Sequence, residues 1–181
     1  MAQFVTLLGS LRKASFNGGI ARALPALAPE GVKIVPLGSV GVFPLYDADV
    51  QAQGFPPAVT AMGEAIRAAD GVIIVSPEYN YSIPGGLKNA IDWLSRLTEQ
   101  PFKAKPILIQ SASPGALGGA RMQYQLRQCF VFLDARVFNT PEVMVGGAMA
   151  KFDKETGDLA DQGTKDFIGK QLAAFAAFAR A

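Results

Sequence analysis

Residues 72 to 93 read Val-Ile-Ile-Val-Ser-Pro-Glu-Tyr-Asn-Tyr-Ser-Ile-Pro-Gly-Gly-Leu-Lys-Asn-Ala-Ile-Asp-Trp, and this stretch decides the fold. Its first four residues form a continuous apolar run, which is typical of a buried strand. From Leu87 onward the apolar residues have the spacing of an amphipathic helix. Two prolines and the pair Gly85-Gly86 keep the connection non-helical. The order strand, loop, helix indicates a parallel sheet, and open parallel sheets bind ligands at the carboxyl ends of their strands.

The same alternation of strands and helices continues on both sides of this stretch. Predicted strands are Phe4–Leu8, Val32–Leu37, Val72–Val75, Lys105–Gln110 and a weaker one around Arg136–Val145, interrupted by Pro141. Predicted helices are Gly18–Leu27, Pro57–Ala69, Leu87–Leu97, Gly119–Leu133 and Asp166–Arg180. Residues 38–57, rich in Gly, Pro and Asp, are predicted to form a loop. This order predicts an α/β fold of the flavodoxin-like, doubly wound kind, with a five-stranded parallel sheet covered by helices on both faces.

Length and composition predict one globular domain over residues 1–181. Half of the 181 residues are hydrophobic, 18% are charged, and the net charge is only +2. A chain of this length fills one core well, and its balanced charge argues against a dedicated nucleic-acid protein. The N-terminus lacks a basic segment of the signal-peptide type, and no apolar run reaches the roughly 18 residues of a membrane-spanning helix. We therefore expect a cytoplasmic protein.

The chain contains no histidine and a single cysteine. Without histidine, neither Ser-His-Asp nor Cys-His catalysis is available, and a catalytic zinc site is not expected. Cys129 cannot form an intramolecular disulfide, and it lies on a predicted apolar helix stripe with Met122 and Leu126. We expect it to be a small buried hydrophobic residue. Trp93 is likewise expected in the core or an interface, and Asp92 in a local ion pair or cap.

The first strand ends in a loop, residues 9–19, that has the features of an anion site. Free N–H groups and the positive dipole at the start of a helix favour a phosphate. Ser10, Ser15 and Asn17 add side-chain donors, and Arg12 adds a permanent positive charge. The loop matches neither the dinucleotide fingerprint nor the P-loop, which favours a terminal monophosphate. The alternative is that Ser15 or Asn17 is only a helix N-cap.

Two further loops follow the third and fourth strands and are expected at the same edge of the sheet. In the first of them, Tyr79 and Tyr81 offer flat surfaces, and the amides of residues 78–80 suit the edge of a planar heterocycle. The alternative is a long turn in which Ser82 caps the next helix and Pro84 lies in its first turn. In the other loop, residues 111–121, Ser113 is a weaker candidate, since Gly-rich turns between strands and helices are common.

Together the three loops resemble the NADPH-dependent FMN reductase family of flavodoxin-like proteins, and especially its bacterial quinone and chromate reductases. The motifs are Gly9-Ser10-x-Arg12-x-x-Ser15-x-Asn17, then Pro77-Glu78-Tyr79-Asn80-x-Ser82-x-Pro84-Gly85-x-Leu87-Lys88-Asn89-Ala90-Ile91-Asp92-Trp93, then Ser113-x-Gly115-x-x-Gly118-Gly119-x-Arg121. In order and spacing the resemblance covers essentially the whole chain.

The resemblance implies noncovalently bound FMN and NADPH or NADH as electron donor. It places the phosphate on Ser10, Arg12, Ser15, Phe16 and Asn17, and the isoalloxazine along Pro77, Glu78, Tyr79, Asn80 and Tyr81, with Ser113 closing the site. It implies small-molecule acceptors used in a ping-pong cycle: quinones, chromate, azo compounds or free flavin. It also implies a homodimer or homotetramer with the flavin near a subunit interface. Our hypothesis is that Arg121 and Tyr124, together with Glu142, form polar contacts at that interface.

Two other classes of protein stay open at this point. A flavodoxin-like electron carrier would bind FMN without accepting electrons from NAD(P)H, although such carriers tend to be acidic. A mononucleotide-binding regulator would be colourless and would take up no FMN.

Overall fold

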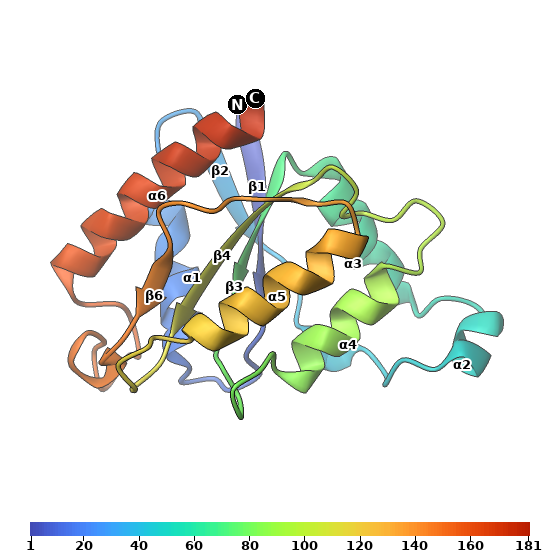
Figure 1. The fold of residues 1–181 in the computed structure, drawn as a ribbon, viewed down its shortest axis with the longest axis horizontal. Coiled ribbons are helices and arrows are strands. Elements are labelled where there is room, and N and C mark those ends of the chain that lie inside the picture. The colour runs from blue at the N-terminus through green and yellow to red at the C-terminus, as the bar shows by residue number, and fades with distance from the viewer.

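The computed structural model describes residues 1–181 as a parallel sheet between two layers of helices (Figure 1). The strands are β1 Ala2–Leu8, β2 Val32–Pro36, β3 Gly71–Val75, β4 Pro106–Ala112, β5 Arg136–Val137 and β6 Val143–Val145. Their order is β2-β1-β3-β4-β5, with β6 also paired to β4, and every pair is parallel. This is the strand order of flavodoxin-like folds, so the predicted fold class is confirmed.

The fifth position of the sheet is divided between two short strands. β5 pairs with the beginning of β4, through Pro106 with Arg136, and β6 pairs with its end, through Gln110 with Val143. Pro141 lies between them, and a proline has no N–H to donate to a sheet. The predicted interruption of this strand is confirmed, and the last strand position contains two separate strands.

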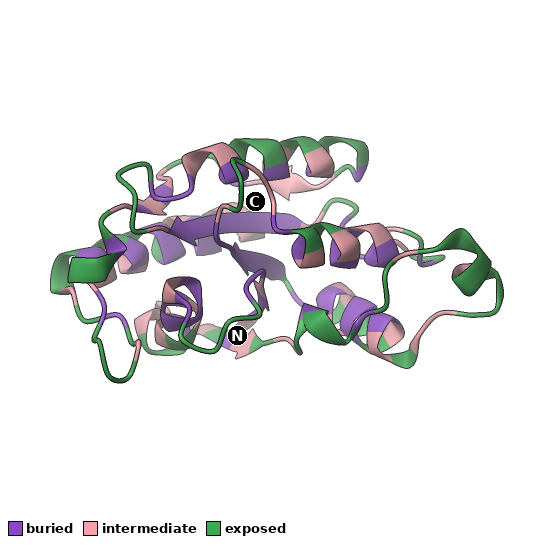
Figure 2. Cartoon of the chain, turned by 90° about the horizontal axis from the view of Figure 1, so that it is seen from below, coloured by how far each residue is buried: buried purple, intermediate pink, exposed green.

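The helices form the two outer layers and cover separate cores. They are α1 Phe16–Leu27, α2 Ala48–Ala52, α3 Pro57–Ala68, α4 Gly85–Leu94, α5 Ala120–Phe132 and α6 Gln162–Arg180, with short 3₁₀ helices η1 Val40–Val42 and η2 Ala148–Ala150. One core lies between the sheet and α3, α4 and α5, and the other between the sheet and α1 and α6. Figure 2 shows the buried strands between these layers. None of the helices is long and apolar enough to span a membrane.

The central strand explains how two cores are possible. All five residues of β3 are buried, and successive side chains of a strand point to opposite faces. Ile74 accordingly belongs to the core under α3, α4 and α5, whereas Ile73 belongs to the core under α1 and α6. Trp93 is fully buried in the first core, as predicted, and Asp92 pairs with Lys88 on the surface of α4.

The segment of residues 38–57, predicted as a loop, contains η1 and α2 and projects to the side of the molecule (Figure 1). Its position is fixed by α4, because Asn89 and Trp93 both donate side-chain hydrogen bonds to the carbonyl of Pro44. Helices of three and five residues are too short to show a hydrophobic period. In the sequence these short helices are marked only by their N-cap residues, Ser39 and Asp47, whose side chains accept hydrogen bonds from backbone N–H groups.

The prediction that Cys129 is a buried residue is wrong. The residue is only half-buried, because it lies at the margin between the buried stripe of α5 and its outer face. Nearby Phe132 is 91% exposed on that outer face. Partial burial raises the pKa of the Cys129 thiol above its ordinary value, so the thiol stays protonated at neutral pH. This disfavours a redox role.

Two glycine substitutions test how closely α1 is packed. A Cβ on Gly19 would lie 2.4 Å from the carbonyl oxygen of Gly157, whereas one on Gly169 in α6 would meet nothing within 4 Å. We expect Gly19→Ala to lower the free energy of unfolding by about 1–3 kcal/mol through overpacking. Gly169→Ala should raise it by about 0.5–1 kcal/mol, because alanine is the better helix former. Urea unfolding of both variants measures the difference, and equal stabilities would contradict the close approach of Gly157 to α1.

Candidate functional site

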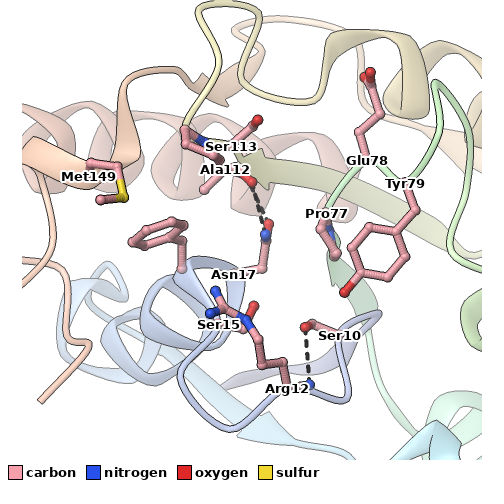
Figure 3. Close-up of a pocket in the computed structure, with 12 residues that line it drawn as sticks. Ser10, Arg12, Ser15, Asn17, Pro77, Glu78, Tyr79, Ala112, Ser113 and Met149 are labelled. Atoms are coloured by element: carbon pink, nitrogen blue, oxygen red, sulfur yellow. Dashed lines mark hydrogen bonds between the residues drawn. The ribbon is translucent and has the colours of Figure 1, made fainter. Parts of the chain in front are cut away.

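A cavity of about 350 Å³ opens at the carboxyl edge of the sheet. Figure 3 shows that three loops and one more distant segment supply its walls. The lining residues are Ser10, Arg12, Ser15, Phe16, Asn17, Pro77, Glu78, Tyr79, Ala112, Ser113, Pro114 and Met149. The loops after β1, β3 and β4 therefore converge as the sequence predicts.

The first turn of α1 is the part of this cavity best suited to an anion. Ser15 is the N-cap residue and is only 3% exposed, yet its side chain caps nothing. The N–H groups of Phe16, Asn17 and Gly18 make no hydrogen bond within the chain. Buried helix ends normally have their N–H groups satisfied, and here a phosphate at the positive end of the helix dipole would satisfy them. The alternative that Ser15 serves only as a cap is not supported.

The Asn17 side chain, predicted to donate to the anion, instead forms hydrogen bonds within the chain. Its Nδ2 donates to the carbonyl of Ala112 and its Oδ1 accepts the N–H of Ala112, both at 2.9 Å (Figure 3). The pairing of β3 with β4 ends at Val75 and Gln110, so the buried Asn17 amide replaces the missing strand partner of Ala112. The side chain thus joins the first loop to the third, and Asn17 offers a ligand only its backbone N–H.

The positive charge beside the helix end comes from Arg12. Its guanidinium lies 5.8 Å from the centre of the Phe16 ring and forms no ion pair within the chain. The backbone N–H of Arg12 lies 3.4 Å from Ser10 Oγ. A cation without an acidic partner next to free N–H groups is the expected electrostatic environment of a phosphate site.

The second loop is closed by a tight turn. Tyr79 and Ser82 exchange backbone hydrogen bonds of 3.0 and 2.9 Å, and the central residues Asn80 and Tyr81 have φ values of 48° and 67°. Asn80 and Tyr81 accordingly lie outside the cavity lining. The N–H groups of Glu78 and Asn80 form no hydrogen bond within the chain and remain available to a ligand. The N–H of Tyr79 is used by the turn.

The alternative role of Ser82 as a helix cap is wrong. α4 begins at Gly85 with Pro84 as its N-cap residue, and Ser82 lies outside it. Ser82 Oγ donates to Gln125 Oε1, and Gln125 Nε2 donates to the carbonyl of Tyr81. These bonds attach the turn to α5 instead of starting α4.

An ion pair attaches the same loop to α5 more firmly. Glu78, whose side chain is 7% exposed, accepts a hydrogen bond of 2.6 Å from Arg121 Nε and one of 3.2 Å from the N–H of Met122. The carboxylate thus lies at the positive end of α5. Its hydrogen bond raises the pKa of Arg121. The Arg121 guanidinium also lies 3.5 Å from the centre of the Tyr81 ring.

The three candidate interface residues form contacts within one chain. Arg121 pairs with Glu78, and Tyr124 Oη donates to Glu142 at 3.1 Å, which raises the pKa of the tyrosine. Arg127 also pairs with Glu142 at 3.3 Å. Because every carboxylate here has a partner, none is placed as a free general base.

The third loop is shaped by close backbone contacts. Ser113 donates its N–H to Val145, and its Oγ accepts the N–H of Gly115. A Cβ on Gly118, which has φ of 59°, would lie 2.5 Å from the backbone of Met144. The loop therefore lies directly on β6, and this contact places Ser113 at the cavity.

Sequence reasoning missed three lining residues, Ala112, Pro114 and Met149. The first two flank Ser113 and follow from its placement. Met149 lies in η2, beyond the last strand, and is largely exposed. An exposed methionine in a short 3₁₀ turn gives no sequence signal, so only the fold could find it.

Known proteins resemble this chain in both sequence and structure. The family model described as NADPH-dependent FMN reductase matches residues 2–150. A quinone reductase of Escherichia coli strain K12 is 60% identical over 177 residues, covering 97% of this chain and 94% of the relative. An NAD(P)H-dependent FMN reductase of Pseudomonas aeruginosa is 48% identical over 172 residues, covering 95% and 92%. The structure of FerB, a flavoenzyme NAD(P)H:(acceptor) oxidoreductase from Paracoccus denitrificans, has a TM-score of 0.88 at 30% identity, covering 99% and 98%.

Proposed function

The chain belongs to the NADPH-dependent FMN reductase family, and from this premise we propose that its cavity binds FMN and transfers electrons from NAD(P)H to quinones. The proposal takes residues 1–181 as one FMN-binding unit with a cytoplasmic location. The quinone acceptor is inferred from the Escherichia coli relative. Chromate, azo compounds and free flavin are proposed as further acceptors.

One observation carries the proposal: the first turn of α1 is buried, uncapped and open to the cavity. The N–H groups of Phe16, Asn17 and Gly18 would hold the phosphate of FMN, with Arg12 balancing its charge and Ser10 and Ser15 adding hydroxyl groups. The ring would lie along Pro77 to Tyr79, where the free N–H group of Glu78 meets its polar edge.

The residues of the chain bind and orient, and none is placed to carry out acid–base chemistry. When bound, FMN supplies the group that accepts a hydride and passes on two electrons. Glu78 is neutralised by Arg121, and Asp92 lies in a surface pair with Lys88. Tyr79 and Ser113 border the cavity and limit how a flat substrate can approach. A single stacking surface used in turn by donor and acceptor would give ping-pong kinetics.

We propose a homodimer or homotetramer, because the outer face of α5 carries exposed apolar side chains. Phe132, Val131 and Tyr124 are all exposed there, and the mean hydropathy of the chain is +0.22. Arg121 and Glu142 border the same face and are candidate contacts. Light scattering of the purified protein measures its mass in solution, and a monomer would contradict this part of the proposal.

Anaerobic reduction tests the function. The purified protein should be yellow, should be bleached by NADPH or NADH, and should regain its colour when a quinone is added. Reoxidation with chromate, an azo dye and free FMN then ranks the other acceptors. A yellow protein that neither nicotinamide bleaches would be an electron carrier. A colourless protein that takes up no FMN would be a regulator, and either result would overturn the proposal.

A further inference from the structure

A second and larger cavity, of about 590 Å³, lies on the other side of the first loop. It opens between α1 and the carboxyl ends of β1 and β2, and its walls include Leu8, Leu11 and Leu37. Small or compact residues on α1, namely Gly18, Ala21 and Pro25, leave the space open. Ser10 and Arg12 line both cavities, so a single loop separates the second cavity from the proposed flavin site.

The charges around this second cavity favour an anion. Arg12, Lys13 and Arg22 line it, and no aspartate or glutamate does. Arg22 is already paired with Asp158 at 2.7 Å, whereas Arg12 and Lys13 form no ion pair within the chain. With Arg12 assigned to the flavin phosphate, Lys13 is the cation left for another ligand.

A polar group without a partner lines the same space. Thr6 is 3% exposed, and its Oγ1 forms no hydrogen bond. A buried hydroxyl normally has a partner, and an unpaired one beside a cavity indicates a ligand or a water. Apolar walls, an unpaired hydroxyl and a free cation together suit a ligand with a flat apolar part and an anionic group.

We propose that this second cavity binds the adenosine 2′-phosphate end of NADPH, an inference that rests on the proposed function. A dinucleotide with its nicotinamide at the flavin must place its adenosine on a neighbouring surface, and this cavity shares two residues with the flavin site. A cation attracts the 2′-phosphate of NADPH, whereas an acidic residue in the same wall would repel it. Here β2 is followed by Leu37, Gly38 and Ser39, without an acid, and Lys13 lines the same cavity.

Two substitutions should change the preference between the nicotinamides. Lys13→Gln removes the free cation, and we expect KM for NADPH to rise roughly tenfold while KM for NADH stays constant. Ser39→Asp adds a negative charge to the wall. Aspartate can still accept the N–H of Gly41, as Ser39 Oγ does at 3.1 Å, so the local cap is preserved. Lys33→Gln makes the same charge change on an exposed position of β2 and should leave both values unchanged.

Direct binding separates this inference from the redox function. Calorimetry on the FMN-loaded protein compares adenosine 2′,5′-bisphosphate with adenosine 5′-monophosphate. We expect the bisphosphate to bind roughly tenfold more tightly, with the advantage lost in Lys13→Gln and Ser39→Asp and kept in Lys33→Gln. Equal binding of the two nucleotides, or bisphosphate binding only when FMN is absent, would overturn the inference. Bleaching of the flavin by NADPH in that same case would leave the proposed function intact.

Discussion

Replacing Ser15 with aspartate is expected to abolish FMN retention while leaving the apoprotein at least as stable as before. Aspartate is as good an N-cap as serine, and its charge favours the positive end of the helix dipole. The same carboxylate would lie where the phosphate is proposed to bind, beside three free N–H groups. Juxtaposed like charges cost several kcal/mol, and about 1.4 kcal/mol is a factor of ten, so FMN affinity should fall at least about a hundredfold.

In Ser15→Asp, FMN affinity should therefore fall while the stability of the apoprotein does not. Fluorescence titration of the apoprotein with FMN gives the affinity, and thermal unfolding of the apoprotein gives the stability. Ser15→Ala is the matched control, because it removes the hydroxyl without adding charge and should weaken FMN binding only modestly. An aspartate variant that binds FMN as tightly as the parent would place the phosphate elsewhere.

Replacing Asn17 with alanine is expected to destabilise the protein even when no flavin is bound. The substitution removes two buried hydrogen bonds and leaves the N–H and carbonyl of Ala112 without partners. An unsatisfied buried group costs about 1–3 kcal/mol, so the free energy of unfolding should fall by roughly 2–4 kcal/mol. The first and third loops should also separate, which lowers FMN affinity indirectly.

Urea unfolding of the apoprotein distinguishes this role from a contact with the phosphate. If Asn17 only contacted the ligand, the apoprotein of Asn17→Ala would be as stable as the parent. Asn139→Ala is a suitable comparison, since Asn139 is exposed and its side chain accepts one hydrogen bond, from Arg127. Its effect should stay within about 0.5 kcal/mol.

The sequence predicts most of this fold because its strands and helices have strong, separate patterns. The uninterrupted apolar run at Val72–Val75 is typical of a buried strand, and it becomes the centre of the sheet. Loops at the ends of parallel strands meet by topology, so Ser10, Pro77 and Ser113 could be placed together without coordinates. The helices α2 and η1 could not be predicted, because they are too short for their apolar residues to show a helical period.

Pairings between distant side chains could not be predicted in the same way. Glu78 and Arg121 lie 43 residues apart, and Asn17 and Ala112 lie 95 apart. A sequence shows that such residues are polar but not which partners satisfy them. The motif predicts that Asn80 and Tyr81 contact the ring. The backbone pairing of Tyr79 with Ser82, which the sequence does not reveal, instead places both residues outside the cavity lining. The second cavity exists because α1 has no large side chains facing it, and no sequence motif indicates such a space.

The divided strand at the end of the sheet has a consequence for aggregation. An exposed strand edge can pair with another chain, and a long flat edge is a hazard. Here one edge consists of β5 and β6, of two and three residues with Pro141 between them. The other edge, β2, carries the exposed Lys33 and ends at Pro36. Neither edge is a template for cross-chain β-pairing, so self-association of this protein should use helix surfaces and should stop at a closed oligomer.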